Sequence, residues 1–180
     1  DIIDSFYSIR ENINRLMYGS YLLELMDLST MEEEPNEKLF YLLRKGLFVL
    51  SKLSMDFLKF TLAYELKYVS FLGYKPYLNK CVNCGSTDLN VIKFNIEKGG
   101  IVCKNCFYKD SYCKNMDLNM YKAMKSLLYT SLDEVIYLKI PEWTTFKLHA
   151  VMEKYILNKI DRKEFKSLNM LKSMIDNGGV

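Results

Sequence analysis

The 180-residue sequence contains no long apolar run and no recognisable export signal. Its apolar stretches all fall short of the ~20 residues that a membrane-spanning helix needs, and no signal peptide is visible. The sequence therefore predicts a cytoplasmic protein with no membrane partner. Asp1 rather than methionine begins the chain, so we expect a fragment or a processed product.

Residues that commonly perform catalysis are also scarce. His149 is the single histidine, and a lone histidine inside a helix is more often structural than catalytic. No glycine-flanked serine, second histidine or phosphate-cradling glycine loop is present. Cys113 has no partner at metal-ligand spacing. The sequence thus predicts a protein that is not an enzyme.

Strong charge of one sign is missing as well. The net charge is +3, with 25 Lys and Arg residues against 22 Asp and Glu residues. Residues 1–76 carry nine basic and eleven acidic residues, residues 77–117 six and four, and residues 118–180 ten and seven. This excess is too small to indicate nucleic-acid binding without other signals.

Five cysteines are present, and four of them form two C-x-x-C pairs. The pairs are Cys81-Val-Asn-Cys84 and Cys103-Lys-Asn-Cys106, with eighteen residues between them. This spacing is typical of a structural zinc site, in which two tight turns aim four sulfurs at one ion from ~2.3 Å. We therefore expect Cys81, Cys84, Cys103 and Cys106 to bind one Zn²⁺.

Three other uses of these cysteines fit less well. Disulfide bonds require an oxidising compartment, which nothing in the sequence indicates. A redox C-x-x-C usually lies in a βαβ unit, which is missing here. A catalytic zinc keeps an open position, whereas four thiolates close its shell, so a zinc-dependent hydrolase is disfavoured. The expected role of the metal is structural.

The residues around the cysteines predict a small β-hairpin. Gly85 can adopt the left-handed backbone that a tight turn after the first pair often needs. Phe107 stands at the corresponding position of the second pair, so that turn must be made in another way. Residues 91–96 are strand-like, residues 98–100 form a turn, and residues 101–102 return as a second strand.

Four lysines lie close to these cysteines in the sequence: Lys80, Lys93, Lys98 and Lys104. Four thiolates on one Zn²⁺ leave an excess of negative charge, which nearby ammonium groups would offset. The same lysines could instead contact nucleic acid through its phosphates. Both interpretations stay open at this point.

Elsewhere, apolar residues recur every three or four positions, which predicts α-helices. The expected ranges are 4–27, 36–53, 56–72, 117–128, 144–159 and 167–175. Asp4 is a suitable N-cap for the first helix, and Asp117 or Asn119 for the fourth. The third helix is apolar on most sides, which indicates a buried element, and it ends at Gly73. Residues 133–140 fit a short strand or a helix equally well.

Short links between broad apolar faces favour an antiparallel helical bundle. The sequence thus predicts a mainly α fold, in which a small zinc-binding β-hairpin module is inserted into a helical bundle. The expected divisions are residues 1–76 for the first part of the bundle, 77–117 for the module and 118–180 for the second part.

Six motifs follow one another along nearly the whole chain: Tyr18-Gly-Ser-Tyr-Leu-Leu-Glu-Leu25, Glu34-Pro-Asn36 with Leu39-Phe40, Tyr64-Glu65-Leu66, Leu72-Gly-Tyr-Lys-Pro76 leading into the first cysteine pair, Gly99-Gly100, and Lys166-Ser-Leu168. In this order they resemble the C-terminal helical domain of the bacterial recombinational repair protein RecO.

The resemblance implies a non-enzymatic mediator that works with RecR and single-strand-binding protein. Such mediators anneal complementary strands and help to load a recombinase onto coated single-stranded DNA. The family's N-terminal domain of the OB type, a nucleic-acid-binding fold, has no counterpart in this sequence. We therefore expect only weak contact with single-stranded DNA, in a bacterial protein associated with the nucleoid. The alternative is a zinc-stapled protein–protein interaction domain with no nucleic-acid role.

The resemblance also implies that the acidic, apolar C-terminal tail of single-strand-binding protein docks on the helical domain. Such a site needs an apolar pocket rimmed by a cation. The third predicted helix offers Lys59, Leu62, Leu66 and Lys67. Relatives often carry arginine before the Phe/Tyr-Glu pair, where this chain has Leu62 and Ala63. Lys59 or Lys67 would then supply the cation.

Overall fold

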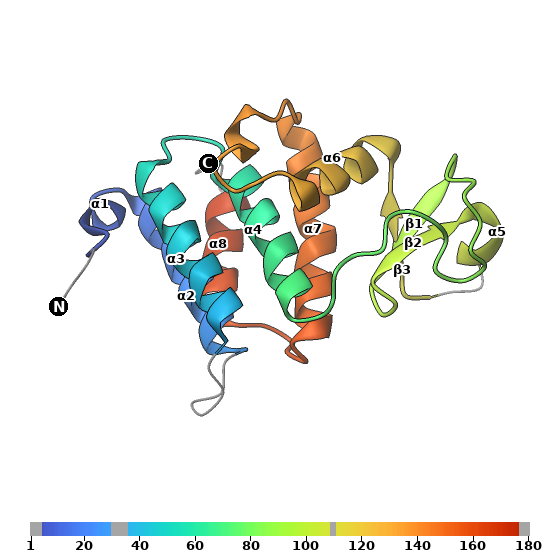
Figure 1. Ribbon diagram of the computed structural model, residues 1–180, viewed down its shortest axis with the longest axis horizontal. Helices are drawn as coiled ribbons and strands as arrows, with labels where there is room; N and C mark the ends of the chain where they lie inside the picture. The colour runs from blue at the N-terminus through green and yellow to red at the C-terminus, as the bar shows by residue number, and fades with distance from the viewer. Residues whose placement is uncertain (1–4, 30–35, 109–110, 177–180) are drawn as a thin grey trace.

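A computed structural model describes residues 5–29, 36–108 and 111–176. A helical body forms one end of the elongated molecule and a small β-sheet module the other (Figure 1). Within the described ranges, the body contains α1 (Tyr7–Arg10), α2 (Ile13–Asp27), α3 (Glu37–Lys52), α4 (Phe57–Phe71), α6 (Leu118–Tyr129), the 3-10 helix η1 (Val135–Tyr137), α7 (Glu142–Lys159) and α8 (Lys166–Asp176). The module contains β1 (Ile92–Asn95), β2 (Gly100–Cys103), α5 (Lys104–Phe107) and β3 (Cys113–Met116). The expected mainly α fold with an inserted β module is confirmed.

The first expected helix, residues 4–27, is two helices in the structure. α1 ends at Arg10, and Asn12 then has an extended backbone with φ −132° and ψ 124°. The Asn12 Oδ1 atom accepts a hydrogen bond from the Arg15 N–H at 3.1 Å, which makes Asn12 the N-cap of α2. The prediction of one continuous helix was wrong because this side chain competes with the helical backbone for an N–H group. Asp4, the expected cap, lies outside the described residues.

α4 is the central helix of the body, as its apolar sequence predicts. Twelve of its fifteen residues are buried, and α2, α3, α6 and α7 pack around it. The helix ends before Gly73, whose φ of +89° lets the chain turn back. The Gly73 and Tyr74 N–H groups then donate to the carbonyls of Ser70 at 3.1 Å and Val69 at 2.7 Å, which is a Schellman motif. No helix in the described part of the chain, α4 included, has both the length and the apolarity to cross a membrane.

The module is a three-stranded antiparallel sheet in the order β2-β1-β3. β1 and β2 form the expected hairpin, with Phe94 opposite Ile101 and a positive φ of +67° at Gly99 in the turn. β3 pairs with the other edge of β1 and places Met116 opposite Ile92. The sequence did not predict β3 because Cys-Lys-Asn-Met contains no β-branched or aromatic residue.

The structure of the segment from α6 to α7 decides which residue caps α6 and which conformation residues 133–140 adopt. Asp117 and not Asn119 is the N-cap of α6, and its Oδ1 atom accepts a hydrogen bond from the Met120 N–H at 2.9 Å. Residues 133–140 form neither a strand nor an α-helix, and contain only the short helix η1. Because most of its carbonyls are not used within a regular element, this segment can accept hydrogen bonds from side chains of the body.

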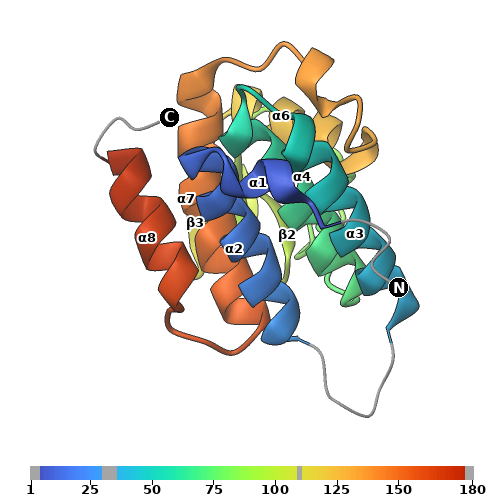
Figure 2. The same cartoon turned by 90° about the vertical axis from the view of Figure 1, so that its left-hand side faces the viewer.

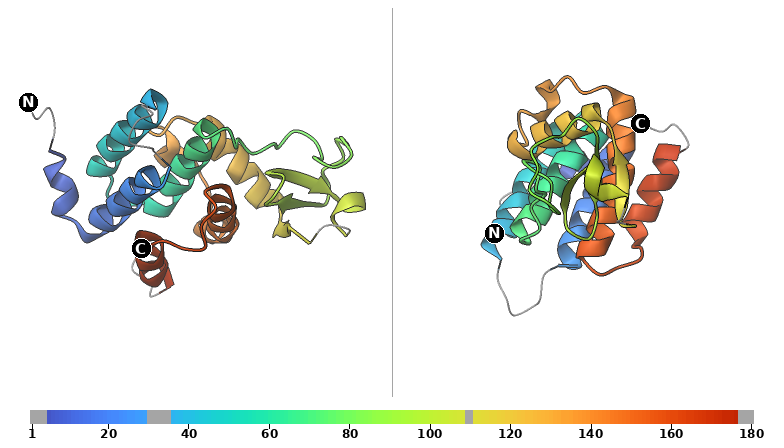
Figure 3. Two further views of the ribbon diagram at one scale, coloured as in Figure 1. Left: turned by 90° about the horizontal axis from the view of Figure 1, so that it is seen from below. Right: turned by 90° about the vertical axis from the view of Figure 1, so that its right-hand side faces the viewer.

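One hydrophobic core runs from the helical body into the module. Phe94 and Ile101 of the module belong to the same buried cluster as the side chains of the bundle. Tyr155 of α7 lies at the junction, where its hydroxyl donates to the Tyr74 carbonyl at 2.7 Å and its ring meets Phe94 edge-on at 5.2 Å. The inner side of the module is therefore held by the body, while α5 lies at the far end (Figure 3).

Candidate metal centre

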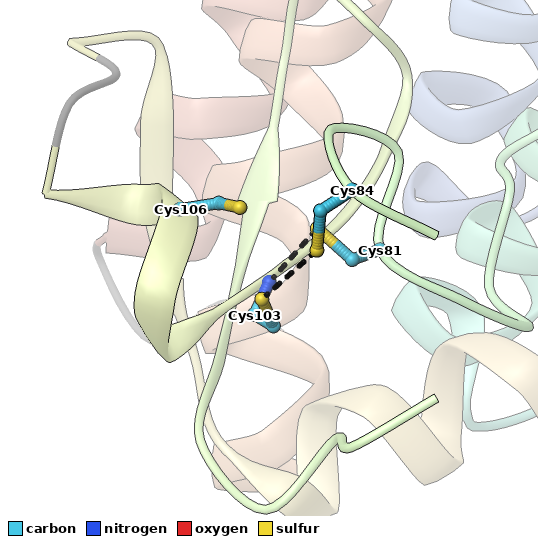
Figure 4. Close-up of side chains that lie close together, drawn as sticks. All are labelled: Cys81, Cys84, Cys103 and Cys106. Atoms are coloured by element: carbon cyan, nitrogen blue, oxygen red, sulfur yellow. Dashed lines mark hydrogen bonds between the residues drawn. The ribbon is translucent and has the colours of Figure 1, made fainter. Parts of the chain in front are cut away.

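The four expected metal ligands come together at the outer end of the module (Figure 4). Their Sγ atoms all lie within 4.8 Å of one another, and those of Cys84 and Cys103 are 3.6 Å apart. A tetrahedral ion with metal–sulfur bonds of ~2.3 Å holds its sulfurs roughly 3.8 Å apart. The four side chains therefore fit around one tetrahedral metal ion.

The first cysteine pair lies on a tight loop before β1. The Gly85 N–H donates to the Cys81 carbonyl at 2.9 Å, and the Cys81 N–H donates to the Ser86 carbonyl at 2.8 Å. Gly85 has a φ of +75°, and a Cβ atom at this position would meet open space. Backbone conformation rather than crowding thus requires glycine here, which confirms the expected left-handed turn.

The second pair uses a turn of helix in place of a glycine. Cys103 ends β2 with an extended backbone, and α5 begins at the next residue. Cys106 lies within α5, so the helical turn brings its sulfur back toward that of Cys103. Phe107 is tolerated because this turn needs no positive φ, and its ring packs in a small buried cluster with Val102.

The four sulfurs differ in their surroundings. Cys81 and Cys103 are buried, Cys106 is half-buried and Cys84 is exposed. Burial by itself raises the pKa of the Cys81 thiol, but backbone N–H groups of Cys103, Cys84 and Asn83 lower that pKa to about 6. The backbone nitrogen of Cys103, one of these donors, lies 3.4 Å from the Cys81 sulfur. Four thiolates in a tetrahedral arrangement suit Zn²⁺ or an iron centre.

A metal at this position would add a link between two segments that already meet through the Val82 N–H, which donates to the Ile101 carbonyl at 2.9 Å. One is the loop that carries Cys81 and Cys84, and the other is the β2–α5 junction. Four protein sulfurs fill a tetrahedral shell, so no position is open for water or a substrate. The arrangement can therefore stabilise the module, but it is not built to activate a reactant.

The lysines near the cysteines occupy separate places in the module. Lys98 lies beside the hairpin turn, where its ammonium donates to the Asn83 Oδ1 atom at 2.6 Å. The Lys93 ammonium lies 4.7 Å from the centroid of the Phe107 ring. The other two lysines, Lys80 and Lys104, are exposed. The contacts of Lys98 and Lys93 are with residues that adjoin ligand cysteines, and a contact with nucleic acid stays a prediction.

Leu62 and Leu66, two of the four residues expected to receive an acidic tail, are fully buried inside the helical body. They do not line an exposed pocket, because other helices cover this part of α4. Lys67 is half-buried, and its ammonium donates to the carbonyls of Leu127 at 3.0 Å and Thr130 at 2.6 Å. Burial lowers the pKa of Lys67 to about 8. That these residues bind a tail stays a prediction.

Lys59, the other expected cation, is also buried near the start of α4. Its ammonium donates to the Asp56 Oδ2 atom at 2.9 Å and to the carbonyls of Ile136 at 3.2 Å and Leu138 at 3.1 Å. The sequence could not show these acceptors, because two of them come from the irregular segment around η1. Lys59 also lines a cavity of about 370 Å³ between the starts of α4 and α7. Lys67, the second expected cation, is not among the residues that line this cavity.

Cys113 and His149 lie outside the group of four sulfurs. Cys113 begins β3, packs against the small cluster around Val102, and accepts a hydrogen bond from the Asn95 side chain at 4.0 Å. His149 is buried in the middle of α7. Both residues thus contribute to the packing of the elements that carry them.

The fold and the site define a helical domain that carries a four-cysteine metal-binding module. The family model described as "Recombination protein O C terminal" matches residues 10–169. DNA repair protein RecO of Alkaliphilus metalliredigens is 34% identical over 169 residues, which cover 94% of this chain and 69% of the relative. DNA repair protein RecO of Acetivibrio thermocellus is 25% identical over 174 residues, and that of Bacillus pumilus 30% identical over 177 residues. Each of these two matches covers 97% of this chain, and 69% and 68% of the respective relative. The chain therefore belongs to the RecO family, of which it spans the C-terminal part.

Proposed function

We propose that this chain is the partner-docking part of a recombinational DNA repair mediator and has no catalytic activity of its own. The observation that carries the proposal is the family match over residues 10–169, together with relatives named DNA repair protein RecO. The four-cysteine group supports a structural metal, since its shell has no open position. The partners in this proposal are RecR, the C-terminal tail of single-strand-binding protein and single-stranded DNA.

Zn²⁺ is the ion that we propose for the four cysteines. The two C-x-x-C pairs and the close approach of their sulfurs suit a tetrahedral zinc site that stabilises the fold. Inductively coupled plasma mass spectrometry of the purified protein should find one zinc per chain. An equimolar iron content with absorbance in the visible range would contradict zinc, and sulfurs oxidised to one another would contradict any metal.

Weak contact with single-stranded DNA is proposed at the lysines of the module: Lys80, Lys93, Lys98 and Lys104. Ammonium groups that bind phosphates release counterions, so the affinity should fall steeply between roughly 50 and 200 mM salt. Fluorescence anisotropy with a labelled oligo-dT strand measures this dependence. Binding that barely changes over this range would contradict phosphate contacts.

Docking of the single-strand-binding protein tail is proposed near the start of α4. Lys59 supplies a buried cation at the cavity of about 370 Å³, and a terminal carboxylate entering that cavity would approach it. Leu62 and Leu66 would support the site from within the core. Lys67 would act from the far half of the same helix, where it holds the end of α6.

A tail peptide with a fluorescent label tests this site. Lys59→Ala combined with Lys67→Ala should weaken its binding, while Lys38→Ala combined with Lys52→Ala on the exposed face of α3 should not. Circular dichroism melting must accompany the measurement, because Lys59 and Lys67 hold carbonyls of the body. Unchanged affinity would reject the site but keep the mediator role. Failure of the unaltered protein to bind the tail, RecR and DNA would reject the function itself.

A zinc-stapled interaction domain without a nucleic-acid role is the second candidate. It is favoured by the small net charge of the chain. It is also favoured because the ammonium groups of Lys59, Lys67 and Lys98 donate hydrogen bonds to other residues of the same chain. A gel shift with single-stranded DNA separates the two proposals. Retarded DNA supports the mediator, whereas binding of RecR without any DNA shift supports the interaction domain.

A further inference from the structure

A groove of about 620 Å³ lies where the module meets the helical body. Its walls come from β1, β3 and α5 of the module, the start of α6 and the middle of α7. Figure 1 shows α6 leading from the helical body toward the sheet, and α7 packs against α6. None of the four ligand cysteines lines the groove, so it is separate from the sulfur group.

The floor of this groove is apolar. Ile92 and Met116 contribute to it from the sheet, and Met120 and Val151 from α6 and α7. These four side chains belong to the hydrophobic core, so the floor is a part of the core that reaches the surface. The flexible thioethers of the two methionines can adjust to apolar groups of different shape. Such a floor fits the apolar side chains of a partner.

The rim of the groove is basic. Its lysines are Lys93, Lys114, Lys147 and Lys154. Asp117 is the one acidic side chain among the described lining residues, and its Oδ2 atom lies 3.7 Å from the Lys147 ammonium. Four ammonium groups against one carboxylate create a positive potential around the apolar floor. The occupant should therefore carry negative charge as well as apolar groups.

We propose that the groove docks a short acidic peptide segment of a partner protein, with its apolar side chains on the floor and its carboxylates at the lysines. The inference rests on the proposed function, in which the chain docks partner proteins, and it names the place and the chemistry of one contact. A buried apolar anchor supplies most of the affinity at such sites. The charged rim sets orientation and speeds association.

Single-stranded nucleic acid, whose weak contact with the module is proposed above to include Lys93, fits the groove itself less well. Binding of bases without sequence preference uses exposed aromatic rings on which the bases stack. Phe107 is the one aromatic residue among the described lining residues; it is 7% exposed and lies under the Lys93 ammonium. The groove therefore offers cations without a stacking surface. A second copy of the same groove is disfavoured because the two rims would carry like charge.

Peptides selected by the protein itself provide the probe. A random dodecapeptide library is panned against the intact chain, and the affinity of the selected peptides is measured by fluorescence anisotropy. We expect acidic residues around one or two large apolar residues. Their affinity should fall roughly 10-fold or more in the Lys114→Glu plus Lys154→Glu variant. Lys38→Glu plus Lys52→Glu makes the same change of charge on α3, at the other end of the molecule, and should leave the affinity unchanged.

Ala150→Trp tests the floor without changing the charge of the rim. Ala150 is exposed on α7 and lines the groove, so an indole there would occupy the space of the peptide anchor. We expect the same loss of affinity as with the charge reversal. Thermal melting by circular dichroism shows whether each variant keeps the fold of the unaltered protein.

Two results would overturn the proposal. One is a set of selected peptides that contain no acidic residues, or that bind the Lys114→Glu plus Lys154→Glu variant as tightly as the Lys38→Glu plus Lys52→Glu variant. The other is a panning experiment that selects no peptide, combined with an oligo-dT strand that binds the unaltered protein but not the Lys114→Glu plus Lys154→Glu variant. That result would assign the groove to nucleic acid. If the selected peptides do not need the groove while the protein still binds RecR and the tail of single-strand-binding protein, the proposed function stands and only the groove assignment fails.

Discussion

Glu24 of α2 caps the N-terminus of α8, although 143 residues separate Glu24 from Ser167 in the sequence. Its Oε2 atom accepts a hydrogen bond from the Ser167 N–H at 2.7 Å, and its Oε1 atom accepts one from the Lys166 N–H at 3.1 Å. Figure 2 shows α8 lying along α2 at this end of the body. One carboxylate thus ties together the two parts of the bundle that precede and follow the module.

Glu24→Ala should loosen α8 and lower the free energy of unfolding by about 0.5–2 kcal/mol, the usual cost of losing an N-cap. Burial raises the pKa of Glu24, but the hydrogen bonds from Ser167 and Lys166 together outweigh it and lower that pKa overall. The native protein therefore loses this contribution as the pH falls below the ordinary carboxyl value of 4.5, and the variant should not. Urea unfolding at pH 7 and pH 3 measures both effects.

Glu164→Ala is the matched control for this prediction. Glu164 lies just before α8, and its carboxylate accepts a hydrogen bond from a side chain, that of Asn169, at 3.2 Å. Its removal should cost less than that of Glu24. Equal losses in the two variants would show that the carboxylate of Glu24 acts through general charge and not as a cap.

The buried Glu65 should make the protein less stable as the pH rises. The Tyr21 hydroxyl donates to its Oε1 atom at 2.5 Å. Burial raises the pKa of Glu65 to about 8, with an opposing effect from the Tyr21 hydrogen bond and a smaller addition from Glu153. The native state therefore keeps a proton that the unfolded state releases above pH 4.5. The free energy of unfolding should fall from about pH 4.5 to pH 8 and then level off.

Glu65→Gln should flatten this pH dependence, because the amide does not titrate. The contribution removed is on the order of 5 kcal/mol across the whole range. Denaturant unfolding followed by tyrosine fluorescence between pH 5 and pH 9 measures it. Tyr21→Phe, which deletes the hydrogen bond but keeps the carboxyl group, should retain the fall with pH. Parallel curves for the native protein and Glu65→Gln would contradict a protonated Glu65.

Removal of the metal should unfold the outer part of the module and leave the helical body formed. Structural zinc contributes ~10–16 kcal/mol of apparent binding free energy in small peptides at neutral pH. Cys84→Ser or treatment with a chelator should expose residues 77–117 to trypsin while most of the helical circular dichroism remains. Cys113→Ser should change neither metal content nor protease resistance, because Cys113 is outside the sulfur group. Loss of all helical signal in Cys84→Ser would show that the shared core needs the module.

Gly99→Ala should destabilise the protein more than Gly73→Ala. Both glycines have a positive φ, so a side chain at either one incurs backbone strain of about 1–2 kcal/mol. A Cβ atom on Gly73 would meet open space, whereas one on Gly99 would overlap the hydroxyl of Tyr155. Thermal unfolding should therefore show an additional loss for Gly99→Ala. That additional loss should shrink in a Tyr155→Phe background, and its persistence there would contradict the clash.

Local signals in the sequence predicted the sulfur group, the β1–β2 hairpin and the long helices. The two C-x-x-C pairs and Gly85 act over a few residues, and the apolar spacing in residues 36–53 and 56–72 repeats within each helix. The break at Asn12 was also encoded locally, in a capping side chain. It was missed because the apolar pattern continues on both sides of the break.

The tertiary structure alone decided how these elements meet. β3 forms because the free edge of β1 accepts it, and Lys59 is buried because carbonyls from the η1 segment are brought to its ammonium. The cap from Glu24 and the basic groove likewise join residues that lie far apart in the chain. Pairing a strand edge or burying a charge is favourable only when its partner is present. Folding supplies those partners from distant positions, and no short stretch of sequence identifies them.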